Sequence, residues 1–145
     1  MIKNIRHIGI VVSNLELSLH FYSDLLGFKV VKKMEESGEY IDNISSLKNV
    51  KITTVKMAAP DGNLVELLYY HSHQRATILH REIWQTGISH IAFSVDDIEQ
   101  EYNRLSAAGV TFNSPPQLST DGYAKVTFCR DPDGNFIELV EVLDK

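Results

Sequence analysis

Hydrophobic and polar residues alternate over residues 5–12, a segment rich in isoleucine and valine, and this pattern predicts a β-strand. Ser13 stands three residues before Glu16, which is the spacing of a capping box, so a helix is expected to begin there. The apolar residues that follow recur at helical spacing. They are Leu15, Leu19, Tyr22 and Leu26.

The same order of patterns returns later in the chain, so the sequence contains an internal repeat. Residues 7–16 match residues 90–99 at an offset of 83, and residues 60–67 match residues 132–139 at an offset of 72. The offsets differ by 11, so the first copy carries about that many extra residues, expected within residues 35–50. Two matches in the same order favour a duplicated module.

The second copy predicts the same elements. Asp96 and Glu99 have the spacing of a capping box, and the helix after them places Ile98, Tyr102 and Leu105 on one face. Gly27 and Gly109 are expected to end the two helices. Short strands are predicted after these glycines, and a hairpin around Pro-Asp-Gly-Asn closes each copy. The predicted strands are residues 28–32, 51–58 and 64–70 in the first copy and 110–112, 124–130 and 136–142 in the second.

These elements predict an α+β fold of two βαβββ modules. The first module covers about residues 1–70, a linker helix about residues 71–86, and the second module about residues 87–145. A module of this size cannot bury its own sheet, so the two are expected to pair within a single domain.

Composition limits the function. The 145 residues carry 14 Lys and Arg against 19 Asp and Glu, a net charge of −5, which disfavours nucleic acid as a partner. We expect no membrane partner, because no apolar run approaches the roughly 18 to 20 residues that span a bilayer. The amino terminus lacks a signal-peptide pattern, so a cytoplasmic location is expected. Cys129, the one cysteine, excludes an internal disulfide and is expected to be buried.

The repeat places four chemically notable residues at equivalent positions: His7 matches His90, and Glu66 matches Glu138. Imidazole and carboxylate are the usual ligands of a borderline divalent cation. Strand parity puts small residues beside each histidine and apolar residues beside each glutamate. The sequence therefore predicts a metal site in a cavity with apolar walls. The alternative is that buried polar pairs hold the modules together.

Three further residues are candidates for contact with a substrate. Tyr70 shares its strand face with Glu66, and Tyr123 and Lys125 lie where the last hairpin begins.

These residues resemble the vicinal oxygen chelate superfamily, which includes glyoxalase I, the bleomycin-resistance proteins and the extradiol dioxygenases. The resemblance covers nearly the whole chain, and glyoxalase I-like and methylmalonyl-CoA epimerase-like members are the most similar. It rests on His7-Ile-Gly-Ile, Val65-Glu66-Leu67, His90-Ile-Ala-Phe and Asp131-Pro-Asp-Gly-Asn-Phe-Ile-Glu138-Leu.

The resemblance implies an open, cup-shaped barrel around one divalent metal ion, of nickel, cobalt, zinc, manganese or iron. By this resemblance His7, Glu66, His90 and Glu138 match the four metal positions of glyoxalase I. It implies a homodimer and a small-molecule substrate with adjacent oxygens. The implied reaction is that of a lyase or isomerase: Glu138 or Glu66 removes a proton alpha to a carbonyl, and the cation holds the resulting enediolate.

Two positions depart from bacterial glyoxalase I and weigh against the use of glutathione. Val11 stands where that enzyme usually has arginine, and Tyr70 stands where it tends to have asparagine. Three alternatives stay open: a methylmalonyl-CoA epimerase-like racemase, an iron-dependent extradiol dioxygenase, and a binding protein for a small molecule without catalysis.

Overall fold

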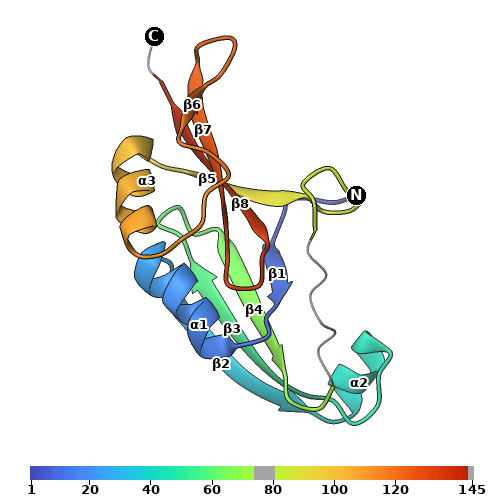
Figure 1. Ribbon diagram of the computed structural model, residues 1–145. Coiled ribbons are helices and arrows are strands. Elements are labelled where there is room, and N and C mark those ends of the chain that lie inside the picture. The colour runs from blue at the N-terminus through green and yellow to red at the C-terminus, as the bar shows by residue number, and fades with distance from the viewer. Residues whose placement is uncertain (74–80, 144–145) are drawn as a thin grey trace. The chain divides into compact units, whose positions relative to one another are not determined.

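The computed structural model describes residues 1–73 and 81–143, which fall into two compact units, Met1–Thr77 and Ile78–Lys145 (Figure 1). Each unit holds one four-stranded mixed sheet and its own helices. The predicted α+β class and the two βαβββ modules are confirmed.

The first unit places its strands in the order β1-β4-β3-β2. Strand β1 runs parallel to β4, and the other neighbours are antiparallel. The hairpin of β3 and β4 was predicted to the residue. The elements are β1 (His7–Val11), α1 (Leu15–Leu19), the π-helix η1 (His20–Leu25), β2 (Lys29–Ser37), α2 (Glu39–Ser45), β3 (Lys51–Ala58) and β4 (Leu64–Tyr70).

The second unit repeats this topology in the order β5-β8-β7-β6, with β5 parallel to β8. Its hairpin, β7 and β8, also has the predicted bounds. The elements are β5 (His90–Ser94), α3 (Ile98–Ala107), β6 (Gln117–Leu118), β7 (Ala124–Arg130) and β8 (Phe136–Val142).

One predicted strand of the second unit is wrong. Residues 110–112 form only an isolated bridge from Phe112 to Cys129, and the strand in this position is the two-residue β6. Pro115 and Pro116 lie between the bridge and β6. Proline has no N–H to donate, so the ladder is interrupted and resumes at Gln117.

Both helices of the repeat begin one residue later than the capping-box spacing predicts. The Asn14 side chain accepts a hydrogen bond from the Leu17 N–H at 3.1 Å, and the Asp97 side chain accepts one from the Gln100 N–H at 2.9 Å. Asn14 and Asp97 are therefore the N-caps.

The first helix also changes character along its length. After Leu19 it continues as the π-helix η1, in which the Leu26 N–H bonds to the Phe21 carbonyl five residues earlier at 3.0 Å. Two consecutive aromatic residues of this turn, Phe21 and Tyr22, are both buried.

The extra residues of the first copy build α2, within the predicted range of 35–50. The Asp42 carboxylate accepts hydrogen bonds from the N–H groups of Asn49 and Val50, both at 2.9 Å, which ties the end of this insertion back to the helix. Ile41 and Val50 pack with Ile52 of β3.

The predicted linker helix over residues 71–86 is not seen in the described part of that segment. Residues 71–73 form bends, and residues 81–86 contain turns and bends. Residues 74–80 lie outside the described residues, so the prediction stays untested there.

The core of each unit lies between its sheet and its helices. In the second unit Ile98 and Leu105 of α3 are fully buried, and the Ile98 N–H donates to Glu141 Oε2 of β8 at 2.9 Å. The face of β8 that carries Glu141 therefore meets the helix, and the opposite face is left for other contacts. Among the described residues, no helix is long and apolar enough to cross a membrane.

Replacing Leu105 by alanine is expected to lower the free energy of unfolding by about 3 kcal/mol, because a buried leucine loses its transfer energy and leaves a cavity. Replacing the exposed Gln100 of the same helix by alanine should change it by less than about 0.5 kcal/mol. Urea unfolding followed by circular dichroism measures both values. Equal effects would contradict the packing of α3 described above.

Candidate metal centre

The first unit brings His7 and Glu66 together on one face of its sheet. In the parallel pair of β1 and β4, Gly9 stands beside Glu66, so the side chains of His7, Gly9 and Glu66 share a face. His7 Nε2 lies 3.8 Å from Glu66 Oε1. The two predicted ligands of the first copy are therefore neighbours.

The second unit repeats this arrangement with a shorter contact. Ala92 of β5 stands beside Glu138 of β8, and His90 Nε2 lies 2.9 Å from Glu138 Oε2. Two donors bound at right angles to one cation at about 2.1 Å would be about 3 Å apart. The 2.9 Å separation is that of a hydrogen-bonded His–Glu pair, and two ligands on one metal ion would have the same spacing.

Both carboxylates are largely withdrawn from water. The Glu66 and Glu138 side chains keep 13% and 19% of their exposed area, against 32% and 35% for the His7 and His90 side chains. A carboxylate buried to this degree needs a compensating donor or cation. A divalent cation would supply that compensation and would use both residues of each pair.

The residue opposite each glutamate differs between the units. Lys56 of β3 pairs with Glu66, and its Nζ lies 3.8 Å from Glu66 Oε2. At the matching place in β7, Phe128 pairs with Glu138, and its ring meets the His90 ring edge to face at 5.1 Å. Both units thus contain the histidine and the glutamate, but the residue opposite the glutamate is a lysine in the first unit and a phenylalanine in the second.

Each unit by itself supplies two of the predicted ligands. Over residues 1–73 and 81–143, no group of three or more His, Cys, Asp and Glu side chains that could hold a metal ion is found. A complete site with four ligands needs both pairs, and their assembly around one ion stays a prediction.

The three predicted substrate contacts fall in different places. Tyr70 lies on the Glu66 face, where it packs with Leu68 against the cluster of Ile41, Val50 and Ile52. The α2 insertion therefore forms an apolar wall on the face that carries Glu66.

Tyr123 and Lys125 are not brought beside Glu138. Tyr123 is 57% exposed and follows a tight turn in which Asp121 accepts hydrogen bonds from the Ser119 hydroxyl and the Tyr123 N–H. These hydrogen bonds lower the pKa of Asp121. Lys125 Nζ pairs with Glu99 Oε1 of α3 at 3.2 Å, so Lys125 lies on the helix side of the sheet.

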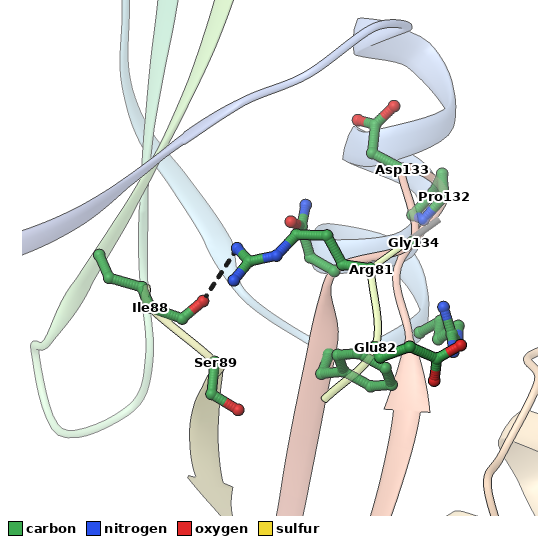
Figure 2. Close-up of a pocket in the computed structure, with 10 residues that line it drawn as sticks. Arg81, Glu82, Ile88, Ser89, Pro132, Asp133 and Gly134 are labelled. Atoms are coloured by element: carbon green, nitrogen blue, oxygen red, sulfur yellow. Dashed lines mark hydrogen bonds between the residues drawn. The ribbon is translucent and has the colours of Figure 1, made fainter. Parts of the chain in front are cut away.

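A cavity of about 340 Å³ in the second unit was not predicted (Figure 2). It lies where β5 and β8 begin, beside Ser89 and Phe136. The Arg81 guanidinium enters it and donates to the carbonyls of Ile88 at 3.2 Å and Thr86 at 3.3 Å. Arg81 therefore holds the segment that leads into His90.

Sequence reasoning also overlooked Lys56. The offset of 72 that matches Glu66 with Glu138 also matches Lys56 with Phe128, so the difference could have been found by aligning the two hairpins. Lys56 has no like residue in the second copy, so residues shared by the two copies do not reveal it.

The chain is similar to a known family and to curated relatives. A family model described as the Glyoxalase/Bleomycin resistance protein/Dioxygenase superfamily matches residues 4–139. Uncharacterized protein YurT of Bacillus subtilis is 32% identical over 133 residues, 92% of this chain and 94% of its own. The lactoylglutathione lyase of Pseudomonas putida is 26% identical over 149 residues, 93% of this chain and 83% of its own.

Solved structures share the fold. A glyoxalase family protein from Bacillus cereus has a TM-score of 0.89 at 20% identity, covering 99% of this chain and 97% of its own. A glyoxalase I mutant from Zea mays has a TM-score of 0.71 at 22% identity, covering 96% of this chain and 44% of its own.

Cys129 should be inert in the folded protein. It is fully buried in β7, and burial raises the pKa of its thiol to about 12, so the thiolate is scarce at ordinary pH. Iodoacetamide at pH 8 should leave the native protein unmodified and should alkylate it in urea, as intact mass will show. Rapid alkylation of the native chain would contradict the burial of this strand.

Proposed function

Because the chain belongs to the glyoxalase/bleomycin resistance protein/dioxygenase superfamily, we propose that it is a metal-dependent lyase or isomerase of the glyoxalase type. The observation that carries this proposal is the His–Glu pair repeated in both units, with each carboxylate largely buried on a sheet face. The curated relatives named lactoylglutathione lyase, at about a quarter identity, support the same reaction class.

The proposed centre holds one divalent cation on His7, Glu66, His90 and Glu138. Two imidazoles and two carboxylates suit nickel, cobalt, zinc, manganese or iron. The spacing of His90 and Glu138 supports this ligand set. The proposal requires both pairs, from one chain or from the two chains of a homodimer, and either source gives the same four donors.

A bound divalent cation would polarise a substrate carbonyl and stabilise negative charge on its oxygen. Glu138 is the proposed base, and its carboxylate would have to come off the cation for this role, because a coordinated carboxylate is a weak base. Its carboxylate takes the proton from the hydroxyl-bearing carbon next to the carbonyl and returns it to the former carbonyl carbon. The hydroxyl proton passes to the former carbonyl oxygen, so the two carbons exchange oxidation level and no external oxidant is needed. Glu66, which faces the Lys56 ammonium, remains a ligand in this scheme.

A racemase of the methylmalonyl-CoA epimerase type is the second candidate, because it would use the two matched glutamates as bases on opposite sides of a planar intermediate. The unequal neighbours of the two glutamates favour different roles for them, and so favour the lyase or isomerase. The substrate in both cases is a small molecule with two adjacent oxygens.

Metal content and hydrogen exchange test the proposal together. The chain loaded with nickel, cobalt, zinc or manganese should hold one ion per set of four ligands. It should also exchange the alpha hydrogen of a hemithioacetal, formed from a thiol and a 2-oxoaldehyde, with deuterium from the solvent. A chelator should abolish the exchange, and restored metal should recover it. A fully loaded protein without exchange on hemithioacetals or acyl-CoA thioesters would count against the proposed reaction.

Substitution of the proposed base gives a sharper result. Glu138→Gln should lower the exchange rate at least about 100-fold, because general base catalysis contributes at least that much. Glu141→Gln is the matched control on the same strand: its side chain lies on the helix face and should leave the rate within about twofold. Comparable losses in both variants would indicate a structural effect instead.

A further inference from the structure

A row of charged side chains crosses the first sheet at the level of the proposed centre. Lys32 of β2 stands directly opposite Lys56 of β3, and Lys56 stands directly opposite Glu66 of β4. Cross-strand partners share a face, so all three side chains lie on the side that carries His7. The row holds two ammonium groups and one carboxylate.

This arrangement is not one that the fold requires. Like charges directly opposite each other on neighbouring strands destabilise a sheet, and the second unit places Phe128 where the first has Lys56. The Lys56 side chain is only 29% exposed, so water screens its charge incompletely. Glu66 offsets one of the two ammonium groups, and Lys32 is exposed, so the row keeps one unbalanced cation that can accept a further anion.

The charge balance of the proposed centre also favours an anion beside it. Two carboxylates balance one divalent cation when both histidines are neutral. Lys56 and Lys32 are then left as an excess of positive charge beside the centre. Farther along β4 the same face is apolar, because Leu68 and Tyr70 pack with the α2 insertion.

We propose that Lys56, assisted by Lys32, binds an anionic group of the substrate, so that the substrate is an oxygen-chelating carbonyl compound that also carries a carboxylate or similar anion. This inference rests on the proposed function, since it assigns the chelating oxygens to the metal centre. Without substrate, Lys56 compensates the charge of Glu66 and competes there with the incoming cation.

Two hydroxamates with the same metal-chelating group allow the anion site to be tested separately from the metal centre. Acetohydroxamate has a methyl tail, and succinate monohydroxamate carries a distal carboxylate. Calorimetry on the cobalt-loaded protein should show the carboxylated probe binding about tenfold more tightly than acetohydroxamate, the size expected of a partly buried ion pair.

The substitution Lys56→Met should remove that tenfold preference and at the same time tighten cobalt binding by about tenfold, because the competitor at Glu66 is gone. A change that merely loosened the strand would weaken both. Lys56→Arg should keep the preference. Lys33→Met is the matched control, since Lys33 stands opposite Val55 on the other face and should alter neither quantity.

The outcomes are distinct. If the wild-type chain binds no divalent metal, the proposed function fails and this inference falls with it. If all variants bind cobalt and neither hydroxamate is preferred, the metal centre stands and the anion site is overturned. Loss of preference in Lys33→Met as well would also overturn it, because the effect would then not belong to this face.

Discussion

The cost of burying a carboxylate shapes both units. Each glutamate is set in a strand whose other residues are mostly apolar, and each loses most of its exposure to water. Such a group persists only where a neighbour compensates its charge. The first and last strands of each module pair in parallel, which brings a histidine to the face that carries the glutamate. The sheet topology therefore provides a partner for each buried carboxylate.

The two units meet this constraint differently. His90 is close to Glu138 and is flanked by an aromatic ring, whereas Glu66 has a more distant histidine and an ammonium group. A duplicated module would begin with identical halves. In this chain Glu138 lies beside an apolar ring and Glu66 beside an ammonium group, which gives the two glutamates unequal electrostatic settings.

Much of the fold followed from the repeat, because period-two patterns and Pro-Asp-Gly-Asn turns are local signals. The hairpins of both copies and the site of the insertion were predicted on this basis. The strand at residues 110–112 was wrong because the later prolines decide where pairing resumes. Lys125 was placed by sequence proximity, although strand pairing sets it beside Glu141, on the face that meets α3 and away from Glu138. The pairing of His7 with Glu66 needed only parity and the repeat.

The α2 insertion belongs to one copy alone and touches the proposed chemistry only through its apolar wall at Leu68 and Tyr70. Its loop is closed by its own carboxylate, Asp42, rather than by residues of the metal pairs. A change in the length or sequence of this segment would therefore reshape the apolar wall and leave both His–Glu pairs as they are.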